Sequence, residues 1–134
     1  MNEFKVYFNE LIKKYDCNVT FCVDKISDKQ LEKVPFIMHD FYKVISKAEL
    51  PFGIIFPLDM ALEASEKEPF THNWFVFGQD NYFSFWLCSY SPDSEGLSFT
   101  AWDHEGGSEI GEAADEDIIS FLKYEEEEYE ENDI

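Results

Sequence analysis

The fold of this chain is decided by residues 74–102, WFVFGQDNYFSFWLCSYSPDSEGLSFTAW. Aromatic and β-branched residues recur here with the period of two that is typical of β-strands. We predict three strands with two hairpin-type loops between them, the strands at 74–77, 82–87 and 97–102 and the loops at 78–81 and 91–96. In this interpretation residues 74–102 form an antiparallel meander.

The segment before the meander begins with a helical pattern. Phe4, Phe8, Leu11, Ile12 and Tyr15 recur at spacings of three and four residues, which predicts an amphipathic helix over residues 2–15. The short alternating run at 19–23 is compatible with a strand. Ser27 and Gln30 then have the spacing of a capping box, which predicts a short helical turn that ends before Pro35.

Pro35 suits the first position of a second helix, which we predict to end near Lys47. Its buried stripe would consist of Ile37, Phe41, Val44 and Ile45. The apolar run 50–57 is bracketed by prolines and indicates a turn into an edge strand, because proline cannot donate to a sheet ladder. Residues 58–66 have a helical pattern again.

The chain closes with a predicted amphipathic helix over 115–124, in which Ile118, Ile119 and Leu122 share one side. Helices followed by an antiparallel meander and a closing helix are typical of an α+β domain. We therefore expect a single α+β domain over residues 1–124, with its N-terminal helices packed on the sheet, followed by an acidic tail over 125–134.

That tail has six acidic residues among the seven from Glu125 to Glu131. Two interpretations are open. Like charges four residues apart oppose a helix, which favours a solvated, frayed tail that mainly adds solubility. A continued helix would instead space its charges about as closely as duplex DNA does, about one per 1.7 Å, which suggests mimicry of nucleic acid toward a nuclease.

The composition excludes several classes of function. The 134 residues suffice for one domain, and 45% apolar residues supply a core. The 29 acidic residues outnumber ten lysines, with no arginine, so the formal net charge is −19. An ordinary nucleic-acid binder needs a basic face, and anionic substrates need arginine forks or similar groups, so neither class is expected.

Location and cofactors follow from the same sequence. Residues 1–5 lack the cationic start of a signal peptide, and no apolar run of about 18 residues predicts a membrane span. Cys17, Cys22 and Cys88 are odd in number and show no Cys-x-x-Cys spacing, so we expect reduced thiols rather than disulfides or zinc. The expectation is a cytoplasmic protein with no cofactor, no metal and no membrane partner.

One cluster has the composition of a catalytic site. His104 lies between Asp103 and Glu105 directly after the third predicted strand. Neighbours on an extended chain point to opposite sides, so the imidazole would face away from the two carboxylates. We expect a strand-end turn here and no enzyme, with acid–base chemistry at Asp103 and Glu105 as the weaker alternative.

Aromatic residues beside acidic loops are candidate anchors for a basic partner protein. Alternate loops of a meander emerge at the same end of the sheet, and on that ground we expect the two groups of loop residues to share a surface. The candidate partner-binding residues are Trp86 near a strand end, Tyr90, Asp93 and Glu95 with one loop, and Asp103 and Glu105 with the other.

Several motifs together resemble the SUKH superfamily, which includes fungal cell-wall regulators and bacterial immunity proteins. In order, these are Val34-Pro35 opening a helix with Phe41-Tyr42, Leu50-Pro51-Phe52-Gly53, Trp74-Phe75-Val76-Phe77-Gly78, Tyr82-Phe83-Ser84-Phe85 and Trp102-Asp103-His104-Glu105. The resemblance covers about residues 25–123. Family members commonly have Asn-Gly after that helix, where this chain has Lys47-Ala48-Glu49-Leu50.

The resemblance implies a single α+β domain that binds and neutralises a cognate bacterial toxin, often a nuclease, without being an enzyme. The acidic composition independently suits a basic partner, since opposite charge accelerates association. The first hypothesis is therefore an immunity protein that masks a basic, nuclease-type toxin. The second is a non-enzymatic interaction scaffold or regulator, and the third is an enzyme that uses residues 103–105.

Overall fold

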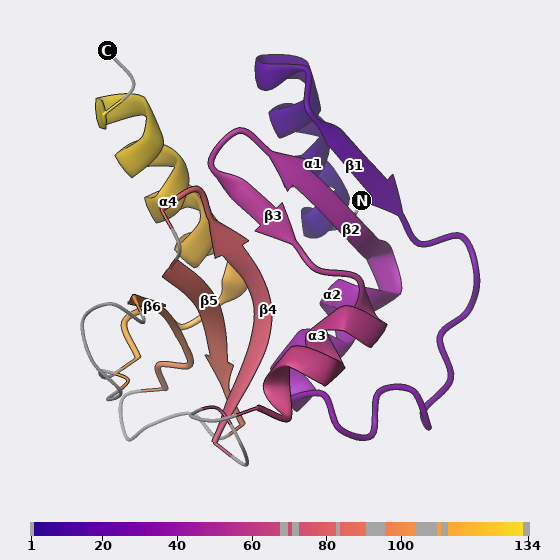
Figure 1. Cartoon of the computed structure of the whole chain (residues 1–134). Coiled ribbons are helices and arrows are strands. Elements are labelled where there is room, and N and C mark those ends of the chain that lie inside the picture. The colour runs from indigo at the N-terminus through magenta and orange to yellow at the C-terminus, as the bar shows by residue number, and fades with distance from the viewer. Residues whose placement is uncertain are drawn as a thin grey trace.

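One antiparallel sheet organises the molecule (Figure 1). Among the residues that this computed structural model describes, 2–67, 70, 73–82, 84–90, 96–103, 110 and 113–132, the sheet has six strands in the order of the sequence. The strands are β1 (Asn18–Phe21), β2 (Ile45–Leu50), β3 (Gly53–Ile55), β4 (Trp74–Asp80), β5 (Ser84–Ser89) and β6 (Phe99–Asp103). The predicted meander is confirmed as β4–β6, and three more strands extend it.

Three helices cover one face of this sheet. They are α1 (Glu3–Tyr15), α2 (His39–Val44) and α4 (Ile118–Asn132). Phe4 of α1 meets Phe41 of α2 at a centroid distance of 5.6 Å, and Tyr42 of α2 meets Phe75 of β4 at 6.0 Å. The expected single-domain α+β architecture, with N-terminal helices on an antiparallel sheet and a closing helix, is what the structure shows.

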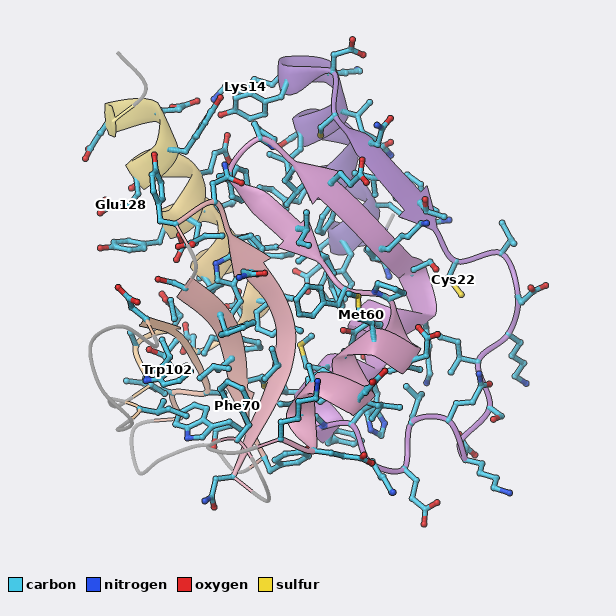
Figure 2. The ribbon with its side chains drawn as sticks, in the orientation of Figure 1. Lys14, Cys22, Met60, Phe70, Trp102 and Glu128 are labelled. Carbon is cyan, nitrogen blue, oxygen red and sulfur yellow. The ribbon has the colours of Figure 1, made fainter. Side chains whose placement is uncertain are left out.

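The remaining helix, α3 (Leu58–Ser65), lies beside β4 where β3 has ended. There the Oγ of Ser65 accepts a hydrogen bond of 2.8 Å from the backbone N–H of Val76. The face opposite α4 carries a smaller aromatic group in which Phe70 meets Phe85 and Trp102 (Figure 2). None of the helices in the described part of the chain has the length and apolar character needed to cross a membrane.

Short-range signals of the N-terminal region are confirmed. The predicted first helix is α1, and Asn2 caps it by accepting a bond from the backbone of Phe4. The capping box also forms: the backbone N–H of Ser27 donates to Gln30 at 2.9 Å, and that of Gln30 to the Ser27 hydroxyl at 3.2 Å. The residues after it make turns.

The predicted helix from Pro35 to Lys47 is wrong in its last three residues. A 3₁₀ turn, η1 (Phe36–Met38), leads into α2, which ends at Val44, and Ile45 begins β2. Ile37, predicted to be buried, is 40% exposed, while Met38 is completely buried. Residues 47–50 are good helix formers, but β2 pairs with β1 on one side and β3 on the other, and this tertiary pairing overrides local propensity.

Two details of the sheet also differ from expectation. The strand after Pro51 is an interior strand rather than an edge, since β3 pairs with both β2 and β4. Pro51 and Pro57 lie just outside it, so no ladder bond is lost. In addition, β4 continues to Asp80, through residues predicted to form a loop, because Gly78 and Gln79 pair with β3 and β5.

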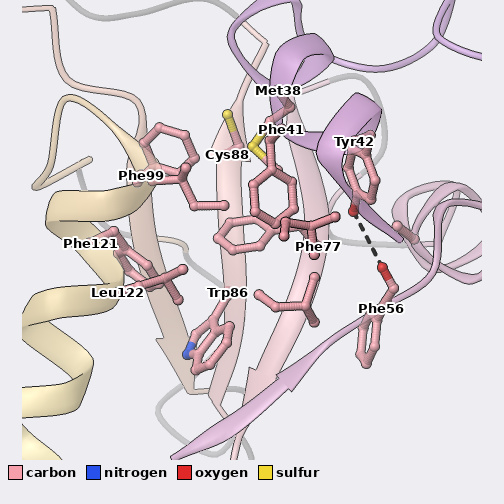
Figure 3. Packing of buried hydrophobic residues seen from close by; sticks show 14 of the residues in the cluster. Met38, Phe41, Tyr42, Phe56, Phe77, Trp86, Cys88, Phe99, Phe121 and Leu122 are labelled. Atoms are coloured by element: carbon pink, nitrogen blue, oxygen red, sulfur yellow. Dashed lines mark hydrogen bonds between the residues drawn. The ribbon is translucent and has the colours of Figure 1, made fainter. Parts of the chain in front are cut away.

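Trp86 occupies the centre of the sheet face under α4 (Figure 3). Its indole is completely buried and contacts Phe52, Phe77 and Phe121 at centroid distances of 5.9–6.2 Å. The ring lies over two glycines of neighbouring strands. A Cβ at Gly53 would come within 2.5 Å of the indole, and one at Gly78 within 2.6 Å.

We expect the substitution Gly78→Ala to destabilise the protein by about 1–3 kcal/mol, the usual cost of overpacking a core. The added methyl group would meet both the indole of Trp86 and the carbonyl oxygen of Ile54, so the backbone must shift. Urea unfolding measures the change. Gln79→Ala on the neighbouring, partly exposed position is the control and should stay within about 0.5 kcal/mol. Equal losses at both positions would contradict this account of the core.

Candidate functional site

The structure separates the sequence-predicted anchor residues. Trp86 is completely buried in the core, so the expectation that it contacts a partner is wrong. Tyr90 is 37% exposed, and its hydroxyl donates to the backbone carbonyl of Lys33 at 3.0 Å. Asp103 is exposed at the end of β6. Asp93, Glu95 and Glu105 lie outside the described residues.

Tyr90 and Asp103, the described members of the two loop groups, also do not share an end of the sheet. Ser84 at the start of β5 pairs with Asp103, whereas Cys88 near the end of β5 pairs with Phe99. Tyr90 and Asp103 therefore lie at opposite ends of this strand pair, about 20 Å apart at about 3.3 Å per residue. The expectation failed because successive loops of a meander alternate between ends, so only every second loop shares an end.

The end of the sheet that carries Asp103 holds a pocket instead. Three segments meet there: the β2–β3 turn, the β4–β5 turn and the C-terminal half of α4. We call this hollow of about 300 Å³ the α4 pocket; it is lined by Phe52, Asp80, Asn81, Tyr82, Tyr124, Glu125, Glu128 and Tyr129. Sequence reasoning missed it because its residues are far apart along the chain.

Hydrogen bonds shape the β4–β5 side of the pocket. One oxygen of Asp80 accepts from the backbone N–H groups of Tyr82 at 2.8 Å and Ser84 at 2.9 Å. The side-chain amide of Asn81 donates to the carbonyl of Pro51 at 2.7 Å, which joins the two turns. These bonds hold the Tyr82 ring at the rim, where it is 72% exposed.

The helix side of the pocket belongs to a segment that the sequence left uncertain. Residues 125–132 continue α4, so the expectation of a frayed tail is wrong, and the expected boundary after residue 124 falls inside a helix. Tyr129 packs on Tyr15 of α1 at 6.0 Å and on Phe52 at 6.3 Å. These contacts offset the repulsion between neighbouring carboxylates.

The acidic run has three separate environments, because side chains three or four residues apart share a side of a helix. Glu126 and Glu130 face α1, Glu125 and Glu128 line the pocket, and Glu127 points into solvent. Figure 2 shows Lys14 reaching from α1 toward the C-terminal end of α4. Only part of the acidic run is therefore open to a partner.

The side facing α1 forms a hydrogen-bonded group that we call the Glu126 cluster, made of Tyr7, Lys14, Tyr15, Glu126 and Glu130. Tyr7 donates to Glu126 at 3.2 Å and Tyr15 at 2.8 Å, while Lys14 forms ion pairs with both glutamates. Burial and the Glu126 charge raise the pKa of the Tyr7 hydroxyl, which keeps it a donor. The cluster fastens α4 to α1.

Inside the pocket, Glu125 has an unfavourable environment for its charge. Burial, followed by the charges of Asp80, Glu128 and Asp115, raises the pKa of its carboxyl to about 7. Beside it, the hydroxyl of Tyr124 is hydrogen-bonded to Glu128, and the ring is 55% exposed. The pocket thus combines aromatic rings with carboxylates, and none of the described residues that line it is basic.

A larger hollow of about 530 Å³ lies between the chain after β1 and the start of α3. Its charged residues are Asp24, Lys25 and Asp59, and the other lining residues are mainly apolar or uncharged. The mixture gives no preference for one class of ligand. Within the described residues, no group of three histidine, cysteine or carboxylate side chains is arranged to hold a metal ion.

Comparisons of the chain with protein-family models, with curated proteins and with solved structures found no match.

We expect Glu126→Ala to lower the free energy of unfolding by about 1–3 kcal/mol, the typical cost of removing hydrogen bonds to a charged group. The Glu126 side chain is only 15% exposed and accepts from three donors. Glu127→Ala removes the same side chain from an exposed position of the same helix, so it is the matched control. Urea unfolding compares the two, and an equal effect would show that the cluster does not hold α4.

The raised pKa of Glu125 predicts that the free energy of unfolding depends on pH. Its ordinary value is 4.5, so the folded state holds a proton that the unfolded state releases between about pH 4.5 and 7. This stabilisation is complete below pH 4.5 and lost as the pH rises through 7. Glu125→Gln should therefore match the parent in stability near pH 4.5 and exceed it at pH 8, measured by urea unfolding.

Glu127→Gln is the control for general charge repulsion, because it removes one exposed charge nearby. Its difference from the parent should change little over the same pH range. Identical pH profiles for the two variants would contradict the buried environment of Glu125.

Proposed function

We propose that this protein is an immunity protein that binds a cognate bacterial toxin domain in the cytoplasm and neutralises it by stoichiometric masking. The observation that carries the proposal is the α4 pocket, where carboxylates and partly exposed tyrosines converge at one end of a protein with a net charge of −19. Exposed aromatic rings beside charges are the residues that most often anchor protein–protein contacts.

A toxin is named as the partner because the motifs of the chain resemble the SUKH superfamily, whose bacterial members neutralise toxins. A basic toxin of the nuclease type fits the charge. An acidic surface attracts such a domain before contact and raises its association rate by orders of magnitude at low salt. Fast association serves an inhibitor, which must bind before the toxin acts.

Inhibition by masking requires a surface complementary to the toxin and does not require a chemical reaction. The described part of the pocket offers groups that can accept hydrogen bonds and attract cations, namely carboxylates, phenols and one amide. Covering the basic surface of a nuclease would block the access of its polyanionic substrate, because that substrate needs the same positive charges.

Titration of the proposed cognate toxin domain, sought first among the products of neighbouring genes, tests this function. Purified protein should form a stable 1:1 complex, and toxin activity should fall linearly to zero at one equivalent. The association rate should fall at least about tenfold between 50 and 500 mM salt, because screening weakens steering. Inactivation at substoichiometric amounts would contradict masking, and a complex with fully active toxin would favour the scaffold alternative.

A further inference from the structure

We infer that the α4 pocket receives one cationic side chain, a lysine or arginine of the partner protein, between its tyrosine rings and its carboxylates. The inference rests on the proposed function for the existence of that partner and adds which chemical group is recognised and where. It follows from the composition of the pocket wall rather than from the overall acidity of the chain.

The aromatic part of the wall favours an organic cation. Phe52, Tyr82, Tyr124 and Tyr129 all line the same hollow of about 300 Å³. The face of an aromatic ring attracts a lysine or arginine head group, and the strength grows as water is excluded. The aliphatic stem of such a side chain can also pack on the rings while its charged end reaches the acids.

The acidic part of the wall supplies the opposite charge at a partly desolvated position. Asp80 and Glu128 lie close enough to Glu125 for their charges to raise the pKa of its carboxyl, in addition to the larger effect of burial. A cation in the pocket would relieve this repulsion. Ammonium and guanidinium groups also donate several hydrogen bonds, which carboxylates accept strongly.

Two other cations fit less well. A divalent metal needs oxygen ligands that converge, and no three carboxylates of the described residues do so. The protein's own Lys14 is engaged by Glu126 and Glu130 on the other side of α4. The cation that matches both the rings and the acids therefore comes from another molecule.

The position of its carboxylates distinguishes the pocket from the rest of the acidic helix. Glu126 and Glu130 face α1 and lie outside the pocket, and Glu127 is exposed without lining it. Charge at Glu127 acts through bulk water, where one ion pair contributes little. The same charge at Glu128 acts beside aromatic rings, where the effective dielectric constant is lower.

The first experiment uses the full-length protein without any toxin. N-acetyl-lysine N-methylamide and its arginine counterpart are titrated while the aromatic NMR signals of Tyr82 and Tyr124 are recorded. We expect saturable shifts with a dissociation constant of about 1 mM, as for a few weak contacts. Equal shifts with sodium chloride, or with the uncharged norleucine analogue, would overturn the inference, because they would indicate screening or nonspecific apolar contact.

Variants locate the binding. Glu128→Gln and Tyr82→Leu should weaken probe binding about fivefold or more, whereas Tyr82→Phe keeps the ring and should change it less than about twofold. Glu127→Gln is the matched control for Glu128→Gln and should also stay within about twofold. Equal weakening by the two glutamate variants would show that overall charge, not the pocket, binds the probe. Thermal unfolding confirms that each variant is folded.

The result is separable from that of the toxin titration. If the probe binds as expected but the toxin does not, the proposed function fails and the pocket remains. If the toxin complex forms and keeps its affinity in Glu128→Gln and Tyr82→Leu, the pocket inference fails and the proposed function remains.

Discussion

The packing of Trp86 over Gly53 and Gly78 is the constraint on which the rest of the structure depends. The indole takes the space that side chains on β3 and β4 would occupy, and a Cβ at either glycine would overlap it. It also contacts Phe52 of the β2–β3 turn and Phe121 of α4. This one side chain therefore sets the distance between the middle of the sheet and α4. Extra volume at this point would destabilise both the sheet and its packing against α4.

The C-terminal helix shows how an unfavourable sequence becomes a regular element. Six acids in seven residues repel one another along a helix, yet α4 continues through them to Asn132. Glu126 accepts from tyrosines of α1, Lys14 neutralises part of the charge, and Tyr129 packs on Phe52 and Tyr15. The same arrangement leaves Glu125 and Glu128 in the α4 pocket, where the described lining residues include no basic side chain, and this is the basis for proposing a cationic partner there.

Sequence patterns predicted elements well where burial follows a local period. Phe4, Phe8 and Leu11 formed the buried side of α1, and the aromatic runs formed β4–β6. The sequence patterns failed where contacts between residues far apart along the chain determine the structure. Residues 47–50 are good helix formers but belong to β2, because β1 and β3 pair with this strand on its two sides. Trp86 is buried because Gly53 and Gly78 leave the space that its indole occupies. No α4 pocket could be predicted, since Phe52, Asp80 and Glu125 have no common motif.

The sequence by itself determined the α+β class, the antiparallel meander and the excess of acidic charge, because alternation, helical spacing and composition are local or additive properties. Only the tertiary structure decided which of those acids is neutralised, which is half-buried and which is open. That assignment depends on the partners that α1, the β2–β3 turn and the β4–β5 turn bring to each carboxylate. Those partners are 40 to 120 residues away along the chain, so no local pattern encodes them.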